Sequence, residues 1–414
     1  MLCLSRRIMF SIIMLVSSVF SFALSIQEPF VTLSGNVCDA VSGKALAYVN
    51  ISVPGEHVMT VTNADGAFVL KTFAKPDKLV LSHVGYKTRR FNVGDDMKKL
   101  SIEMSPSTIM LSEVIVGTGD ARELLRAAIS KIPQNYSARP ELFRGFYRET
   151  TQRGHRYIYV AEAVMDMYKS EYTKPVTFDR VSIEKARRLI STKQTDTLGA
   201  KVQGGPTLPI HLDLVKNSAD LLNEADLENY DLSFSSPINI DDRPQLVVVI
   251  RPRRVSDFAL YNGKIYIDKE SLAFSRIELS LDMKDNEKAT RQMLVKKPFG
   301  VRFKPREMLI QVNYSFEDGI SRINYVKSIS RFNCDWKRRL FHSGYVVTSE
   351  MVVTDRYAAD KIHQISGRDS FGSTSSFYDK VESFDVPNFW GRDNIIEPTE
   401  SLENAIDKLK NKLR

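Results

Sequence analysis

Histidines and acidic residues are the side chains of this chain that could bind a metal. A zinc protease needs paired histidines and an acid at fixed spacing, and no histidine here has Asp or Glu at the offsets of the HxxE or HExxH patterns. His211 and Asp213 lie close in sequence, and we expect them to be a solvated pair in a loop or at a helix start. The sequence therefore predicts no metal site and no cofactor. The histidines are His57, His83, His155, His211, His342 and His363.

The patterns of common nucleophilic and phosphate-binding sites are also missing. The chain has no Gly-x-Ser-x-Gly turn, and neither Gly43-Lys44 nor Gly263-Lys264 is followed by Ser or Thr, as a P-loop requires. Cys334 has no histidine near it in sequence. We therefore predict a non-enzymatic protein. An enzyme whose site is assembled by the fold from distant segments is the alternative.

Basic residues cluster at several places in the second half of the chain. Such clusters could contact anionic lipid headgroups, lipopolysaccharide or polysaccharide. The alternative is that they are solvated side chains that keep strand faces and edges from pairing with other chains. The residues that we single out as a candidate anionic contact are Arg251, Arg253, Arg254, Lys296, Lys297, Arg302 and Lys304.

The overall composition is that of a globular protein. The chain has 414 residues, 43% of them hydrophobic and 26% charged, which is enough apolar content to bury a core. This length suggests two or three domains. The formal net charge of +8 is spread over a long chain and does not by itself indicate nucleic acid as a partner.

Residues 1–25 have the pattern of a secretory signal peptide. Arg6 and Arg7 precede an apolar run at 8–24, and small residues follow, so cleavage is expected after Ser25. A retained membrane anchor is the alternative. We therefore expect an exported protein, periplasmic or associated with the outer membrane. Its partner would be an envelope protein, a glycan or a lipid, with peripheral membrane contact and no nucleic acid.

Two cysteines remain after removal of the signal peptide, Cys38 and Cys334. Because they fall in different predicted domains, and Cys38 lies on the polar side of its strand, we expect two unpaired thiols. A disulfide between them is the alternative in an exported chain.

Residues 30–105 are predicted to form a small all-β domain. Val31, Leu33 and Val37 alternate with polar residues, as in a strand with one buried face. The turn at 63–66 is expected to close a hairpin, with Gly66 adopting a positive φ. Short strands at this regular spacing indicate a Greek-key sandwich. The expected strands are 31–38, 48–53, 58–62, 68–70, 79–82, 91–93 and 100–104.

Four spaced motifs in this region resemble the carboxypeptidase-regulatory, transthyretin-like domain. The resemblance implies a prealbumin-like sandwich of seven strands, found in Bacteroidetes-type bacteria at the front of exported proteins and outer-membrane receptors. The name of that domain does not imply peptidase activity. The motifs are Gly35-x-Val37-x-Asp39, Gly43-x-x-Leu46-Ala47-x-Val49, Asp65-Gly66-x-Phe68 and Gly85-Tyr86.

After a linker at 106–119, residues 120–414 are predicted to form a larger, mainly antiparallel β-rich domain with a helix at each end. Asp120 can cap a helix that Pro133 ends, and an apolar stripe from Leu402 to Leu413 predicts the last helix. Glu317-Asp318-Gly319 is expected to join two long strands as a hairpin. The strands are expected at 246–250, 264–268, 273–282, 292–296, 307–316 and 320–332. The fold class is thus mainly β, α+β overall.

Two weaker resemblances concern the larger domain. The segments at 132–136, 145–149 and 387–402 resemble a group of uncharacterised exported proteins with the same front domain. The predicted hairpin at 261–268 and the long strands after it resemble the half-barrel of periplasmic lipoprotein carriers. We therefore expect an envelope protein whose sandwich mediates interaction and whose β-rich domain binds a ligand or partner. A carrier that holds an acyl chain in its half-barrel is the alternative.

Overall fold

The computed structural model describes residues 30–95, 99–107, 120–191, 193, 200–218, 221–336, 343–372, 377, 382–383 and 389–411. The predicted signal peptide and most of the predicted linker lie outside these residues. Within the described part of the chain, no helix is long and apolar enough to cross a membrane.

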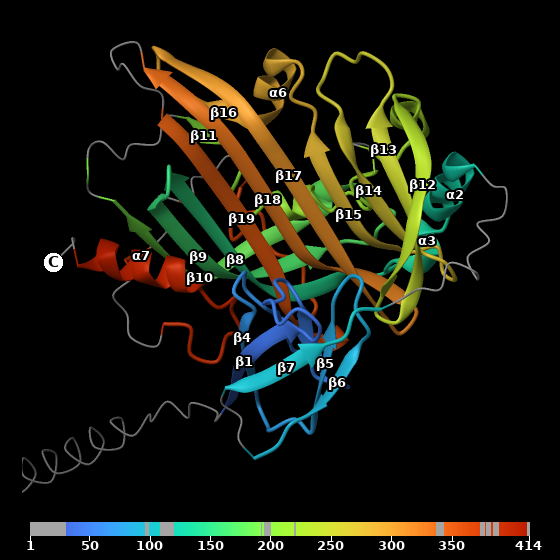
Figure 1. Cartoon of the computed structure of the whole chain (residues 1–414), viewed down its shortest axis with the longest axis vertical. Coiled ribbons are helices and arrows are strands. Elements are labelled where there is room, and N and C mark those ends of the chain that lie inside the picture. Colours follow the sequence, from blue (N-terminus) through green and yellow to red (C-terminus); the bar gives the residue numbers. More distant parts are fainter. Residues whose placement is uncertain are drawn as a thin grey trace, which may run out of the picture.

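The N-terminal domain is a β-sandwich of two sheets, with strand orders β4-β1-β7 and β3-β2-β5-β6 (Figure 1). Leu33 and Val37 of β1 are fully buried between the sheets, because alternate side chains of a strand point to one face. The predicted seven-stranded sandwich is confirmed. Its strands are β1 (Val31–Asp39), β2 (Asn50–Ser52), β3 (Met59–Val61), β4 (Ala67–Thr72), β5 (Lys78–Ser82), β6 (Arg89–Asn92) and β7 (Leu100–Met104).

The turn at 63–66 lies where it was predicted, but it does not close a hairpin. It carries the chain from β3 in one sheet to β4 in the other. Gly66 has a φ of 75°, and a Cβ there would lie 2.6 Å from the carbonyl oxygen of Val37. Glycine is therefore required at this position both by the backbone conformation and by the close approach.

The second domain is built on one sheet of eleven strands, in the order β12-β13-β14-β15-β17-β18-β19-β8-β9-β10-β20 (Figure 1). Its neighbouring strands are antiparallel except for β10 and β20. This confirms the predicted antiparallel β-rich domain. The strands are β8 (Glu141–Arg153), β9 (Arg156–Lys169), β10 (Arg180–Ile190), β12 (Tyr230–Ile240), β13 (Arg243–Pro252), β14 (Tyr261–Asp268), β15 (Phe274–Leu281), β17 (Val301–Glu317), β18 (Ile320–Trp336), β19 (Ser343–Arg356) and β20 (Glu382–Ser383).

The hairpin at Glu317-Asp318-Gly319 is confirmed. Asp318 and Gly319 both have positive φ, at 52° and 78°, as the tight turns that join twisted strands require. The turn fixes the pairing of β17 with β18, two strands of 17 residues each.

Two segments of the sheet differ from the prediction. Residues 261–268 form one strand, β14, and not a hairpin. Gly263 makes no turn there. Instead, a Cβ at Gly263 would lie 2.1 Å from the carbonyl oxygen of Glu278 on the paired strand, so close backbone approach requires the glycine. The strand predicted at 292–296 is shorter in the structure. Its first two residues end the helix α6 (Asn286–Met293), and the rest form the short strand β16 (Leu294–Lys296), which pairs with β11 (Lys201–Val202).

The terminal helices are close to those predicted. Asp120 caps α2 (Ala121–Ser130) by accepting a hydrogen bond from the Arg122 amide at 3.0 Å. Pro133 does not end the helical region, because it lies in the first turn of a second short helix, α3 (Ile132–Asn135), where its missing N–H costs nothing. Thr399 caps α7 (Glu400–Lys410), which packs on β9 and β10 through Leu402, Ile406 and Leu409.

The large sheet is covered on its inner face and on part of its outer face. The inner face, which carries Val312, Val326 and Met351, packs against α2, α3, α6 and residues 200–227. We call residues 200–227 the covering segment. It contains α4 (Leu208–His211) and α5 (Glu224–Leu227), and it buries Leu214, Leu221 and Leu222 against the strands. The outer face packs against the sandwich, the segment 389–399 and α7.

The covering segment is held by buried charges as well as by apolar contacts. Lys169 at the end of β9 bonds Asp213 at 2.6 Å and Asp179 at 3.3 Å, and Lys216 bonds Asp179 at 2.6 Å. All four residues are at least 94% buried. Burial alone lowers the pKa of Lys169, but the two aspartates outweigh it and the pKa is raised. We call these four residues the inner ion network.

The expectation for Asp213 is therefore wrong. Its neighbour His211 is exposed as expected, whereas Asp213 is completely buried. Tyr172 and Tyr314 donate hydrogen bonds to its two oxygens, each at 2.9 Å. The partners come from distant strands, so sequence proximity to His211 carried no information about them.

Asp213→Ala is expected to destabilise the protein by about 3 to 5 kcal/mol, because it leaves two buried lysines with one carboxylate. The measurement is the free energy of urea unfolding. Asp95→Ala is the matched control, since Asp95 forms an exposed ion pair with Lys75 and its removal should change stability little. Equal effects of the two substitutions would contradict a structural role of the inner ion network.

Candidate functional site

A row of charged side chains crosses the outer face of the large sheet. The pairing register places residues of alternating charge opposite one another on five neighbouring strands, β18, β19, β8, β9 and β10. Opposite charges on directly facing residues stabilise strand pairing. These residues, which we call the charge row, are in order Lys327, Glu350, Arg148, Glu162 and Arg187.

Glu162 is the most deeply buried member of the charge row, at 1% exposed. Arg148 lies 2.6 Å from one of its carboxylate oxygens and Arg187 lies 2.8 Å from the other. Burial alone raises the pKa of Glu162, but the two guanidinium groups outweigh it and the pKa is lowered. The carboxylate is therefore held ionised between two cations.

The two arginines also hold the C-terminal segment 389–399, which we call the strap. Arg148 donates a hydrogen bond to the carbonyl oxygen of Ile396 at 2.7 Å. The Arg187 guanidinium lies over the ring of Trp390, 4.7 Å from its centroid, a cation–π contact. Since Glu162 orients both guanidinium groups, one buried carboxylate fixes the strap on the sheet.

The strap also contacts the sandwich. The amide of Lys71 on β4 donates to the Asn394 side chain at 2.7 Å, and Asn394 donates back to the Lys71 carbonyl at 3.0 Å. Asn63 donates to the carbonyl oxygen of Pro398 at 3.0 Å. The strap is thus bonded on one side to the sheet and on the other to the sandwich.

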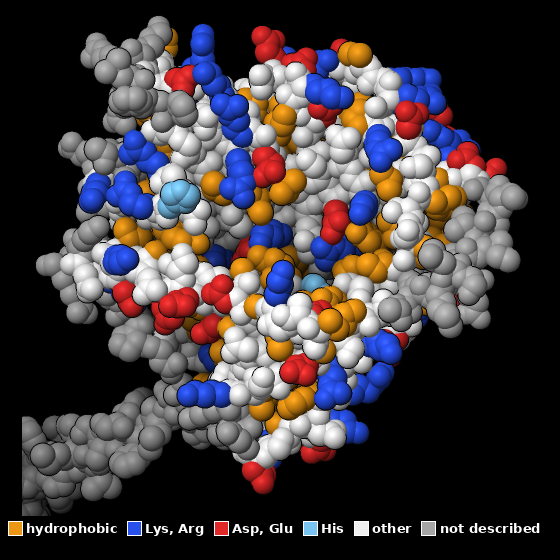
Figure 2. Space-filling view, viewed as in Figure 1, with side chains coloured by type: hydrophobic (Ala, Val, Ile, Leu, Met, Phe, Trp, Pro, Cys, Tyr) orange, Lys and Arg blue, Asp and Glu red, His pale blue; other side chains and the backbone are white. Residues whose placement is uncertain are grey.

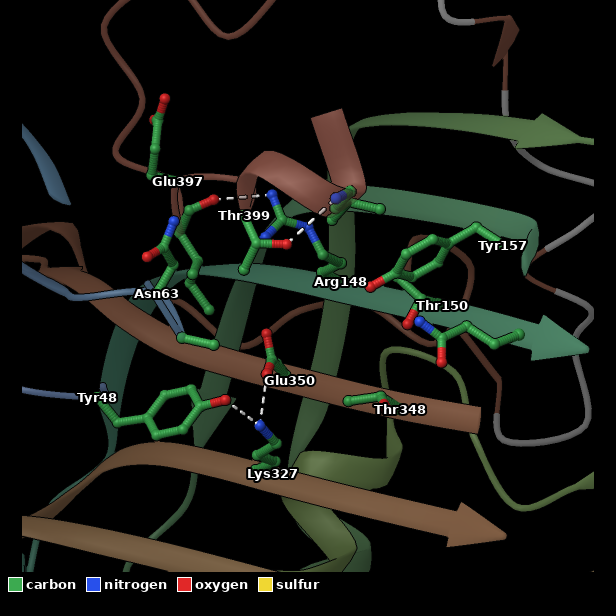
Figure 3. A pocket seen from close by; sticks show the side chains of 14 residues that line it. Tyr48, Asn63, Arg148, Thr150, Tyr157, Lys327, Thr348, Glu350, Glu397 and Thr399 are labelled. Carbon is green, nitrogen blue, oxygen red and sulfur yellow. Dashed lines mark hydrogen bonds and ion pairs between the residues drawn. The ribbon is translucent and has the colours of Figure 1, made fainter. Parts of the chain in front are cut away.

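A cavity of about 160 Å³ lies where the sandwich, the strap and the charge row meet (Figure 3). Its floor is formed by side chains of β8, β18 and β19, and its other walls by the sandwich and the start of α7. The lining is mostly polar. It includes Tyr48, Arg148, Thr150, Lys327, Thr348 and Glu350.

Lys327 connects the cavity floor to the sandwich. Its ammonium group forms an ion pair with Glu350 at 3.0 Å and a hydrogen bond with the Tyr48 hydroxyl, and it lies 4.0 Å from the centroid of the Tyr48 ring. Burial alone lowers the pKa of Lys327, but Glu350 outweighs it and the pKa is raised. Tyr48 has a φ of 61°, a conformation uncommon for a non-glycine residue.

The seven basic residues predicted from sequence all lie toward the end of the large sheet farthest from the sandwich. Arg251 lies in the last two residues of β13, and Arg253 and Arg254 follow that strand in the loop to β14. The others lie on β16, on the start of β17 or between them. Arg291 of α6 donates to the carbonyl oxygen of Asp257 at 3.2 Å, so α6 joins the two groups. We call residues 251–258 and 294–304 the basic rim.

The ion pairs of these basic residues are few and exposed. Arg253 and Arg254 lie 3.7 and 3.8 Å from Glu228, and Lys304 lies 2.7 Å from Asp335. Arg251, Lys296 and Arg302 make no ion pair within the described part of the chain. Lys297 donates to the Val301 carbonyl at 2.7 Å.

Exposed apolar side chains accompany the basic ones at the rim. Phe299 is 100% exposed and Val255 is 94% exposed. Val295 and Phe258 are 56% and 48% exposed. In Figure 2, Lys and Arg side chains lie along the upper end of this face, above the sandwich, with some Asp and Glu side chains among them. A folded chain rarely leaves large apolar side chains together in water without a use for them.

The side chains considered first for chemistry are not brought together. Within the described residues, no group of three or more His, Cys, Asp or Glu is placed to hold a metal ion. Cys38 and Cys334 are both free, so the expected unpaired thiols are confirmed. Burial raises the pKa of Cys334 to about 11, which leaves it protonated and a poor nucleophile. His342 and the basic residues at 337–339 lie outside the described residues.

Comparison with protein families identifies the sandwich. Residues 33–116 match the CarboxypepD_reg-like domain. The N-terminal domain of this chain is therefore a CarboxypepD_reg-like domain, as its motifs indicated. The match covers about a fifth of the chain and leaves the large sheet without a family. No curated protein sequence matches the chain.

Several solved structures are loosely similar to this one. They include a domain described as an outer membrane lipoprotein-sorting protein from Vibrio parahaemolyticus (10% identity, TM-score 0.26, 59% of this chain and 96% of that one). A DUF1329 family protein from Desulfovibrio piger has 10% identity, a TM-score of 0.23 and coverage of 57% and 94%. A LolA superfamily protein from Nitrosomonas europaea has 11% identity, a TM-score of 0.18 and coverage of 58% and 97%. Likeness at these TM-scores carries no conclusion about function.

Sequence reasoning found the basic residues of the rim but missed the charge row and the cavity. Arg148 lies in the segment 145–149, which was singled out from the sequence only for its resemblance to other exported proteins. Glu162 and Glu350 lie in strands whose pairing was not predicted. The alternation of charges exists only across strands, in the register of the folded sheet. Two arginines among the aromatic residues of 143–149, Arg144 and Arg148, are the signal that could have pointed to it.

Glu162→Gln is expected to lower stability by about 3 kcal/mol at pH 7, because two buried arginines lose their carboxylate. The lowered pKa of Glu162 means that its contribution is present above the ordinary value of 4.5 and is lost as the pH falls through the folded-state pKa. The gap between wild type and variant in urea unfolding should therefore shrink as the pH is lowered below 4.5 and through the folded-state pKa. Glu103→Gln, at an exposed position on β7, should show no such gap. A gap independent of pH would refute the assignment.

Proposed function

We propose that this chain is an exported, non-enzymatic protein of the cell envelope that binds the surface of an anionic membrane through its basic rim. The observation that supports this most directly is the coincidence of basic and exposed apolar side chains at the end of the sheet away from the sandwich. Neither a charge cluster nor an apolar patch alone would favour a lipid surface over other partners.

The charge of the basic rim suits an anionic surface. Residues 251–258 and 294–304 contain seven Lys and Arg and one acid, Asp257. Each basic residue near an anionic bilayer contributes about 1 kcal/mol of binding free energy. The exposed ion pairs with Glu228 and Asp335 are weak, so they do not remove these charges from the surface.

The apolar side chains suit the boundary between lipid headgroups and acyl chains. Phe299 and Val295 flank Lys296 and Lys297 in one short segment, so apolar groups can enter the headgroup layer while the ammonium groups meet phosphates. Solvated strand edges would explain the basic residues. They would not explain why a valine of the rim, Val255, is 94% exposed.

The carrier alternative concerns the inner face of the sheet. An acyl chain would need apolar space there, and the covering segment packs its own side chains on that face. A carrier function would therefore require residues 200–227 to move away from the strands, against the inner ion network and the apolar contacts. For this reason the basic rim is the stronger basis for a function.

Lys296→Glu combined with Lys297→Glu is expected to weaken binding to vesicles of phosphatidylglycerol and phosphatidylcholine at least about ten-fold, because two favourable charges become unfavourable. The measurement is co-sedimentation with vesicles. The wild-type protein should bind the anionic vesicles, dissociate from them at about 0.5 M salt, and show no binding to vesicles of phosphatidylcholine alone. Phe299→Ser should weaken binding without changing its salt dependence.

Matched controls lie on the sandwich. Lys44→Glu combined with Lys78→Glu makes the same change of net charge at exposed positions, and Phe73→Ser removes a phenyl ring that is 59% exposed. Both should bind as wild type does. If rim and sandwich variants lose binding equally, net charge alone drives association. If wild type does not bind anionic vesicles, the proposed function is wrong.

A further inference from the structure

We propose that the cavity between the sandwich, the strap and the charge row binds a single sugar ring. This site is separate from the basic rim and independent of the proposed membrane contact. It lies on the outer face of the sheet, where three parts of the chain that are distant in sequence meet (Figure 3).

The size of the cavity sets the size of the ligand. A cavity of about 150 Å³ holds benzene in a protein interior, and this cavity measures about 160 Å³. It is too small for a typical drug-sized or cofactor ligand, whose pockets span about 300 Å³ or more. One six-membered ring is therefore the largest group that it can enclose.

The lining offers hydroxyl groups that have no protein partner. Thr150 and Thr348 both line the cavity, and neither hydroxyl has a hydrogen-bond partner within the described part of the chain. Both hydroxyls are open to the cavity and not enclosed in the core. A ligand that both donates and accepts, as a sugar hydroxyl does, satisfies such groups in either orientation.

The charges of the lining are already paired. Lys327 is neutralised by Glu350, and Arg148 is neutralised by Glu162 while it also donates to the strap. Neither cation of the cavity floor is therefore available to bind the carboxylate of a ligand. This makes an amino acid or the C-terminus of a peptide an unfavourable ligand. A neutral ligand can instead accept and donate hydrogen bonds along the row without separating either ion pair.

Glu397 is the remaining acid of the lining, and it does not change this balance. It is half-buried, and in Figure 3 its carboxylate points away from Lys327 and Glu350. Burial raises its pKa, so the neutral form is favoured relative to an exposed glutamate. The cavity therefore lacks a strong net charge.

A bound sugar would touch both domains. Tyr48 and Asn63 belong to the sandwich, whereas Thr150 and Thr348 belong to β8 and β19. Binding should consequently stabilise the contact between sandwich and sheet. A neutral ring of about a dozen heavy atoms is expected to bind with a Kd near 1 mM, given the usual free energy per atom.

The test uses the full chain without its signal peptide, titrated with glucose, galactose, mannose and N-acetylglucosamine and followed by ligand-observed NMR. At least one sugar should bind near 1 mM. Thr150→Val, which keeps the shape and removes the hydroxyl, should weaken that sugar about five- to ten-fold. Thr32→Val is the matched control, because Thr32 is an exposed strand residue of the sandwich, and it should bind as wild type does.

Thermal unfolding of both variants separates loss of binding from loss of fold. If Thr150→Val melts as wild type does and still binds the sugar equally well, the cavity is not the site. If no sugar of the panel binds at about 50 mM, well above the expected Kd, the proposal is wrong. Binding of glycine or alanine in place of the sugars would likewise overturn the assigned ligand class. None of these outcomes depends on whether the basic rim binds lipid.

Discussion

The charge row is the constraint on which the arrangement of the outer face depends. Its members alternate in sign only if five strands keep one register, since a slip of one residue turns every side chain to the opposite face. With Glu162 fully buried between Arg148 and Arg187, a slip would bury unpaired charge at a cost of several kcal/mol. The same two arginines then hold the strap, and the strap holds the sandwich. One ladder of charges thus sets both strand register and domain placement.

The two faces of the sheet are covered differently. The inner face packs against α2, α3, α6 and the covering segment, with the inner ion network buried among them. Part of the outer face is covered by the sandwich, the strap and α7. The contact with the sandwich combines an apolar cluster, in which Val61 packs with Phe146 and Trp390, with the polar and charged side chains that line the cavity. The cavity therefore lies at the polar part of this junction.

Local patterns allowed much of the fold to be predicted. The alternation of β1, the turn at Asp318 and Gly319 and the cap at Asp120 each depend on neighbours within a few residues. Features that depend on distant partners were missed. Gly263 looked like a turn because its close approach to Glu278 is visible only across strands, and Asp213 looked solvated because its lysine and tyrosine partners lie elsewhere in the chain. The charge row was not predicted for the same reason, since the alternation of its charges depends on how neighbouring strands are paired.

The basic rim and the cavity lie far enough apart to act at the same time. The turn between β12 and β13 contacts the sandwich, where the Thr88 amide donates to Asp242 at 2.8 Å, whereas Arg251 lies near the other end of β13. The strand β13 therefore runs from the sandwich to the rim. If the rim rests on lipid, the sandwich points away from the membrane and the cavity stays in water (Figure 1). A lipid contact would then orient the cavity toward soluble or surface-attached glycans without blocking it.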